Sequence, residues 1–198
     1  TRADHMQFVG GIANKSIVQT HLFYLNLMDD IYSTYRAVQP GETPFPFTDV
    51  PESRWSYPYI RQLYDAGVVS GMTATTFAPA ENMTRAQFVT MLAGLQGADV
   101  SAYRTGKFTD VPADAWYAPY VSWAAENGVV HGVSDTAFAP DADISRQDMA
   151  VMVYRYAERF GIRLGTDVPP VTFADAGDIA AYALPAVLYY HCLLYTSD

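Results

Sequence analysis

Two arginines stand at matching places in the sequence and could bind a negatively charged ligand. Each follows a hydroxyl residue, in the segments Thr84-Arg85-Ala86-Gln87 and Ser145-Arg146-Gln147-Asp148. A guanidinium can bind a carboxylate through two parallel N–H bonds, which a lysine cannot reproduce. We predict that both arginines lie at helix starts, near the positive end of the helix dipole, where an anion is favoured. These residues therefore point to anion binding.

An aspartate and a tryptophan precede each arginine: Asp49 and Trp55 in one case, Asp110 and Trp116 in the other. A tryptophan ring offers an apolar face and an aspartate offers hydrogen-bond acceptors, so both residues could take part in binding a ligand. Other interpretations stay open, because the tryptophans could be core aromatics, the aspartates could form Asx turns, and the arginines could make surface ion pairs.

Other kinds of site lack the residues they need. Asp135, Asp141 and Asp143 resemble a calcium loop, but the glycine and the terminal glutamate of such a loop are missing, so we predict a solvated loop. The four histidines do not have the spacing of a metal site. The sequence contains no Gly-x-Ser-x-Gly segment. We therefore predict no active site within residues 45–198, and no metal or cofactor.

A repeat of 61 residues must position these side chains. Phe47-Thr48-Asp49-Val50-Pro51 recurs as Phe108-Thr109-Asp110-Val111-Pro112, and 18 of 46 positions are identical between 47–92 and 108–153. A third copy begins at Phe173-Ala174-Asp175 but lacks the later Gly-Val-Val-x-Gly turn and the arginine. Copies of this size cannot bury their apolar faces alone, so we expect them to pack on one another.

Each complete copy is predicted to form a helix, a long loop and a second helix. Pro58 and Pro119 fit the first turn of the first helix, and Gly67 and Gly128 fit a left-handed C-terminal cap. The second helix starts with Thr84 and Gln87 as a capping box, or with Ser145 and Asp148 as a looser version. Its apolar stripe predicts a core face, made of Phe88, Met91, Leu92 and Leu95, and of Met149, Met152, Val153 and Tyr156.

Composition narrows the possible partners. The chain has 198 residues, a formal net charge of −9 and 50% hydrophobic residues. The acidic balance argues against a nucleic-acid surface and a basic membrane-surface helix. No apolar run is long enough to span a bilayer, and no signal peptide is visible. One cysteine rules out a disulfide framework.

The repeat divides the chain into four parts. Residues 1–42 are an N-terminal helical segment with a linker, in which 15–38 read as one helix and Thr1-Arg2-Ala3-Asp4 matches the closing half of an upstream copy. Residues 43–106 and 107–166 are the two repeats, and 167–198 hold the truncated third. The tail from about residue 191 does not continue the helical pattern. We predict that it is not native sequence; a divergent native C-terminus is the alternative.

Phe-x-Asp-Val, a tryptophan six residues after the aspartate, Gly-Val-Val-x-Gly, Phe-x-Pro and Thr-Arg-Ala-Gln together resemble the S-layer homology domain. The resemblance covers 45–160 closely and 167–188 in part. It implies a mainly α fold, in which tandem helix–loop–helix repeats pack as a pseudo-threefold, three-pronged bundle with an incomplete third repeat. It also implies an extracellular, non-catalytic anchor that binds pyruvylated secondary cell-wall polysaccharide on peptidoglycan and tethers a larger exported protein.

The resemblance assigns glycan-binding residues position by position. They are Asp49, Trp55, Gly71, Thr84, Arg85, Gln87, Asp110, Trp116, Gly132, Ser145, Arg146 and Asp148. Gln147 departs from the small residue usual there, and only Asp175 survives in the third copy, which puts a third groove in question. Gly71 and Gly132 are expected to mark positive φ or a close backbone approach.

The net charge of −9 opposes long-range attraction of an anionic glycan, so binding must depend on local geometry. Two other functions remain open. One is a helical-repeat module that binds protein, including other surface-layer proteins or further copies of itself. The other is the tether of a surface hydrolase whose catalytic domain lies upstream.

Overall fold

The computed structural model describes residues 44–103, 106–162, 173 and 176–195. Within these ranges lie α3 (Tyr57–Asp65), α4 (Arg85–Gln96), α5 (Ala118–Glu126), α6 (Arg146–Phe160), the 3-10 helix η1 (Ala176–Asp178) and α7 (Leu184–Tyr195). The sole β pairing in the described part of the chain is an isolated bridge between Thr84 and Asp143. The fold is mainly α, as predicted. The predicted helix 15–38, the segment 1–4 and Asp175 lie outside the described residues.

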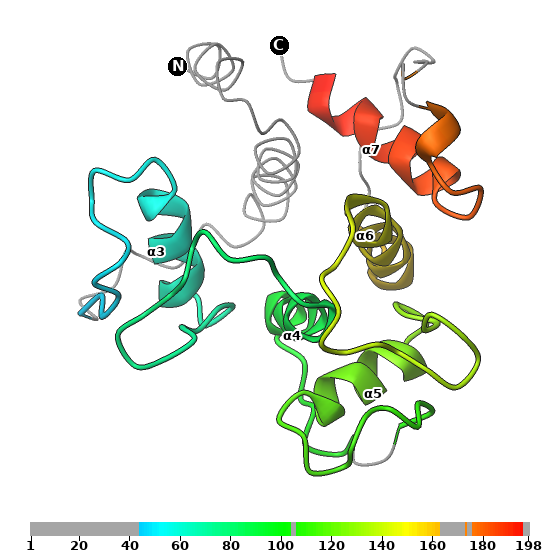
Figure 1. Ribbon diagram of the computed structural model, residues 1–198, viewed down its shortest axis with the longest axis horizontal. Coiled ribbons are helices and arrows are strands. Elements are labelled where there is room, and N and C mark those ends of the chain that lie inside the picture. Colours follow the sequence, from blue (N-terminus) through cyan, green and yellow to red (C-terminus); the bar gives the residue numbers. More distant parts are fainter. Residues whose placement is uncertain (1–43, 104–105, 163–172, 174–175, 196–198) are drawn as a thin grey trace.

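The second helix of each repeat packs on the first helix of the next. Thus α4 packs on α5, and α6 packs on α7. Figure 1 shows α4 and α6 near the centre, with lobes formed around α3, α5 and α7. This arrangement agrees with the predicted packing of copies on one another. Because no glycine or proline follows Pro185, α7 runs to Tyr195, although the sequence pattern had predicted an earlier end.

The ends of the helices follow the local sequence. Pro58 and Pro119 lie in the first turns of α3 and α5. Gly67 and Gly128 follow these helices with φ of 68° and 73°, which confirms the left-handed caps. At α4, Thr84 and Gln87 form the complete capping box. At α6, the Ser145 hydroxyl accepts from the N–H of Asp148, the looser version that was expected.

One hydrophobic core joins the repeats. The predicted stripes of α4 and α6 are buried in it, and it continues through α5 to Ala183, which directly precedes α7, and Ala186 within α7. A smaller cluster, made of Phe47, Val50 and Ile60, lies in the first lobe. Each fully buried large side chain contributes roughly 1.5–3 kcal/mol, so the two central helices anchor the assembly. No helix among the described residues is long and apolar enough to cross a membrane.

The loop glycines allow the backbone to approach the phenylalanine that opens each repeat. A Cβ atom on Gly71 would overlap the Phe47 ring, and one on Gly132 would lie 2.5 Å from Cε1 of Phe108. Gly132 also has φ of 90°, whereas Gly71 does not have a positive φ. The predicted close approach is therefore confirmed at both glycines, and the positive φ at Gly132.

Candidate functional site

Arg85 is the first residue of α4, and its side chain reaches into the second repeat. Nε donates to the carbonyl oxygen of Phe138 at 2.9 Å, and Nη1 donates to Oδ2 of Asp148 at 3.2 Å. The guanidinium also lies 5.0 Å from the centre of the Phe138 ring. The residue is only 5% exposed. Burial lowers the pKa of Arg85, and the carboxylate of Asp148 opposes that change.

The backbone at the start of α4 is tied to the same loop. The N–H groups of Arg85 and Ala86 donate to the carbonyls of Ala142 and Pro140 at 2.9 and 3.0 Å. These are N–H groups that a helix start leaves without an intrahelical partner. We call the start of α4, the loop 138–144 and Asp148 the first junction. Because the loop already uses these N–H groups, an anion at this junction must be bound by side chains.

Asp49 and Asp110 hold the loops that follow the two glycines. Asp49 accepts from the N–H groups of Phe77 and Ala78 at 2.9 and 2.7 Å. In the second copy, Asp110 accepts from Phe138 and Ala139 at 2.8 and 2.7 Å. These bonds span 28 or 29 residues and are not local Asx turns. Each aspartate thereby stabilises an alanine whose φ is positive, 63° at Ala78 and 58° at Ala139.

The pKa values of both aspartates reflect these bonds. The N–H of Phe77, followed by that of Ala78, lowers the pKa of Asp49 against an opposing effect of burial. At Asp110, burial acts to raise the pKa, but the N–H groups of Phe138 and Ala139 outweigh it and the net change is downward. Both carboxylates therefore favour the ionised form, which accepts the N–H bonds that hold the loops.

Asp148 connects all three copies. Its Oδ2 accepts from Arg85 of the first copy and, at 2.9 Å, from the hydroxyl of Ser145. Its Oδ1 accepts from the hydroxyl of Tyr182, in the third copy, at 2.7 Å. Burial, and then the hydrogen bond to Asp148, raise the pKa of Tyr182 to about 12, so this hydroxyl remains a donor at neutral pH. Next to Asp148, the Gln147 side chain accepts from the N–H of Ala180 at 2.9 Å.

We call the start of α6 together with Ala180 and Tyr182 the second junction. Sequence reasoning did not single out Tyr182 or the Phe138 carbonyl. A signal for Tyr182 was present, because it aligns with Tyr117 in the third copy. No sequence signal indicated the Phe138 carbonyl, because every residue has a backbone carbonyl.

The remaining predicted site residues lie apart or at the surface. Trp55 and Trp116 are 45% and 59% exposed, so neither is a core aromatic. Arg146, at the start of α6, is exposed. The structure brings Arg85, Asp110, Ser145 and Asp148 together, whereas Asp49, Trp55 and Gly71 belong to the first lobe.

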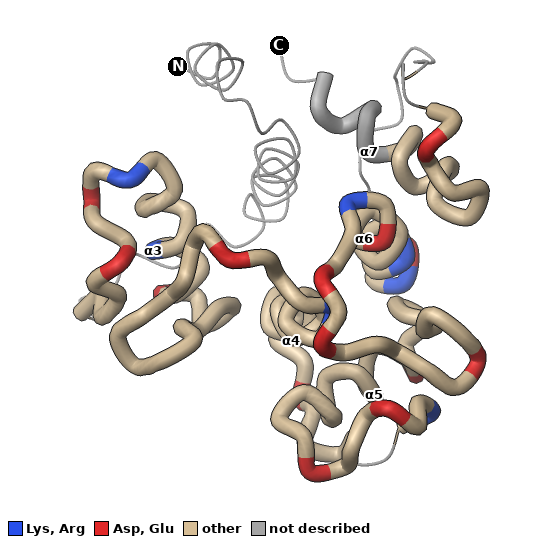
Figure 2. The backbone as a smooth tube through the Cα atoms, viewed as in Figure 1, with Lys and Arg blue, Asp and Glu red and all other residues tan. Residues whose placement is uncertain are grey.

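Acidic residues are spread over the loops of the lobes (Figure 2). Asp135, Asp141 and Asp143 are exposed, as expected of a solvated loop. Asp143 accepts from the amide of Asn82 at 2.9 Å, a residue one repeat period earlier. In the parts of the chain that are described, no group of three or more His, Cys, Asp or Glu is placed to hold a metal ion.

Comparison with known proteins finds the same repeat. The model of the S-layer homology domain family matches residues 46–89 and 107–150. An endoglucanase of Bacillus sp. (strain KSM-635) is 36% identical over 143 residues, which cover 72% of this chain and 15% of that protein. The surface-layer 125 kDa protein of Lysinibacillus sphaericus is 33% identical over 124 residues, 63% of this chain and 10% of that protein.

A cellulosome-anchoring protein of Acetivibrio thermocellus is 31% identical over 132 residues, 64% of this chain and 28% of that protein. The chain thus spans less than a third of the length of each of these relatives. The matches confirm the family that the sequence motifs indicated.

Proposed function

Since residues 46–89 and 107–150 are S-layer homology domains, we propose that this chain is a non-catalytic anchor that holds a larger exported protein on a bacterial cell wall. It binds peptidoglycan-linked secondary cell-wall polysaccharide, whose pyruvyl ketals carry the carboxylates that the arginines meet. The observation that carries the proposal is the placement of arginine, aspartate, tryptophan and glycine at equivalent positions of two copies.

The side chains have separate roles in this proposal. Trp55 and Trp116 present exposed ring faces on which a sugar can pack. Arg146 meets a carboxylate at the surface. Arg85 has five N–H donors, of which Phe138 and Asp148 use two, so it retains donors for a ligand.

The other predicted residues position these groups. Thr84 with Gln87, and Ser145 with Asp148, fix the helix starts that carry the arginines. Asp49 and Asp110 hold the loops, and Gly71 and Gly132 let the loops pack closely.

The names of the relatives support an anchor. One is a cellulosome-anchoring protein, another is a surface-layer protein and a third is an endoglucanase, and each shares only a small part of its length with this chain. A segment common to such different proteins is better suited to attachment than to catalysis. The endoglucanase favours a hydrolase as the cargo, and the surface-layer protein favours association with other surface proteins as the rival function.

Retention on purified cell-wall sacculi tests the proposal. We expect sacculi to retain the chain, and sacculi stripped of secondary polysaccharide to release it. Arg146→Ala should weaken retention, whereas Arg159→Ala, which removes the same charge from the other end of α6, should not. Equal retention on intact and stripped sacculi would refute glycan anchoring. Association that rises with protein concentration in the absence of glycan would favour the rival function.

A further inference from the structure

Asp148 lies on Arg85 where the proposed function places a carboxylate of the ligand. The contact is a single bond of 3.2 Å between Nη1 and Oδ2. Charge-assisted N–H bonds to carboxylates are usually shorter, about 2.7–2.9 Å, and the strongest arginine pairs form two of them in parallel. The side chain of Asp148 is 28% exposed, whereas that of Arg85 is 5% exposed. Asp148 therefore covers the arginine with a bond that a better-aligned carboxylate could replace.

Asp148 does not depend on Arg85 alone. The hydroxyl of Ser145 donates to Oδ2 at 2.9 Å, and the hydroxyl of Tyr182 donates to Oδ1 at 2.7 Å. Both bonds are shorter than the bond to Arg85. If Asp148 left the arginine, its charge would keep two hydrogen-bond partners and its side chain is partly exposed, so the usual penalty for an unpaired buried carboxylate would not apply in full.

The charges at the first junction also make Asp148 a competitor of a ligand carboxylate for Arg85. Two carboxylates, of Asp110 and Asp148, act on the single guanidinium of Arg85. A third negative charge brought by a ligand would be repelled as long as Asp148 stays in place. A neutral sugar gains nothing from displacing Asp148, because it cannot compensate a buried guanidinium.

We propose that Asp148 is a specificity-determining residue, an internal carboxylate that a ligand must displace from Arg85, so that the junction accepts only ligands with a carboxylate that pairs with the guanidinium through two bonds. Tyr182 holds Asp148 from the other side, and the incomplete third copy thereby contributes to a site between the first two. The identity of the ligand as a pyruvylated glycan rests on the proposed function, but the exchange at Arg85 can be measured without it.

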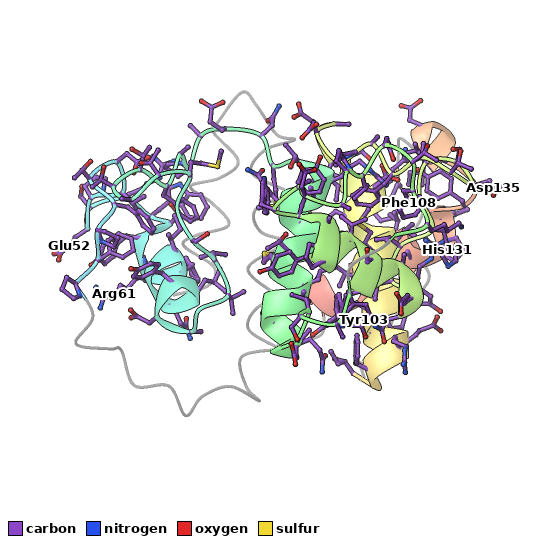
Figure 3. All side chains as sticks on the ribbon, turned by 90° about the horizontal axis from the view of Figure 1, so that it is seen from below. Glu52, Arg61, Tyr103, Phe108, His131 and Asp135 are labelled. Carbon is purple, nitrogen blue, oxygen red and sulfur yellow. The ribbon has the colours of Figure 1, made fainter. Side chains whose placement is uncertain are left out.

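Asp148→Asn tests the exchange, because asparagine keeps the shape and an acceptor while losing the charge. Sodium pyruvate serves as the probe, titrated against sodium chloride at equal ionic strength, with the NMR signal of the Arg85 Nε–H as the readout. We expect pyruvate to bind D148N about tenfold more tightly than the unaltered chain. Asp135→Asn is the matched control, because it removes the same charge from an exposed loop at the outer edge of the second lobe (Figure 3).

Equal or weaker pyruvate binding by D148N would overturn the proposal, as would an equal gain in D135N. Tyr182→Phe gives an independent check, since it leaves the charge of Asp148 in place and removes only the hydroxyl that holds it. We expect a gain of two- to threefold in this variant, and no gain would also contradict the exchange. Failure of the proposed function is visible separately, as equal retention of the unaltered chain on intact and stripped sacculi.

Discussion

The two junctions of this chain place an arginine at the same position of a helix start but in different surroundings. At the first, Arg85 is buried and bonded to the carbonyl of Phe138 and to Asp148. At the second, Arg146 is exposed, and the third copy supplies Ala180 and Tyr182 to Gln147 and Asp148. The contacts that bury Arg85 therefore come from the second repeat, through the carbonyl of Phe138 and the carboxylate of Asp148.

The reason lies in the loop that receives the arginine. Phe138 is held by Asp110, and the loop then runs through Pro140 to Ala142, whose carbonyls accept from the start of α4. At the second junction, the described residues of the third copy that bind the start of α6 are Ala180 and Tyr182.

Replacing each arginine by alanine tests this contrast and should have the largest effect. Arg85→Ala removes two hydrogen bonds and the contact with the Phe138 ring, and it leaves Asp148 without its cation. Because the buried carbonyl of Phe138 loses a charged donor while Asp148 keeps its bonds to Ser145 and Tyr182, we expect the free energy of unfolding to fall by about 2–4 kcal/mol. Arg146→Ala should change it by no more than about 0.5 kcal/mol, as is usual at the surface. Urea unfolding measures both, and equal losses would contradict the contrast.

The glycines sharpen the comparison in the loops themselves. In both Gly71→Ala and Gly132→Ala, the added Cβ would overlap a phenylalanine ring and two carbonyl oxygens. Gly132→Ala would in addition have to adopt a positive φ, which Gly71→Ala would not. We expect overpacking to cost about 1–3 kcal/mol in each, and Gly132→Ala to cost about 1 kcal/mol more.

Gly128→Ala is the control, because its φ is positive but no atom lies within reach of the added Cβ. The same unfolding assay should show the smallest loss for this variant. A larger loss for Gly71→Ala than for Gly132→Ala would show that backbone strain is not what separates the two loops.

Much of this fold could be predicted because its signals are local. The capping box at Thr84, the caps at Gly67 and Gly128 and the stripes of α4 and α6 depend on neighbours a few residues away. The burial of Arg85 could not be predicted, because it depends on a loop more than 50 residues later and on the angle at which the copies pack. Arg146 holds the equivalent place in its motif, and the departure at Gln147 does not indicate that the two arginines differ in exposure.

The same limit applies to the aspartates and the third copy. Asp49 and Asp110 were identified as site residues, but their bonds to loops 28 residues away require the folded loop. Tyr182 reaches Asp148 only because α7 packs on α6. Local pattern thus predicts the elements, and packing between copies determines the contacts of the candidate site.

The smallest expected effect concerns a feature that the two copies share, the hydrogen bonds by which Asp49 and Asp110 hold their loops. In the unfolded chain an aspartate titrates near its ordinary pKa of about 3.9, and in the folded chain both pKa values lie lower. The stability that the two carboxylates contribute is therefore fully present above about pH 4 and is lost as the pH falls through the folded pKa values.

The thermal unfolding temperature should fall between pH 6 and pH 2 because of this loss. Asp49→Asn and Asp110→Asn should each reduce the fall by a similar amount. Because both carboxylates are close to solvent, we expect shifts of only a few degrees. If only Asp110→Asn reduced the pH dependence of the unfolding temperature, the loop contacts of the two aspartates would differ as the arginines do, and the contrast between the copies would extend from the junctions into the lobes. An equal reduction in both variants would confine the contrast to the junctions, where the next repeat supplies the partners.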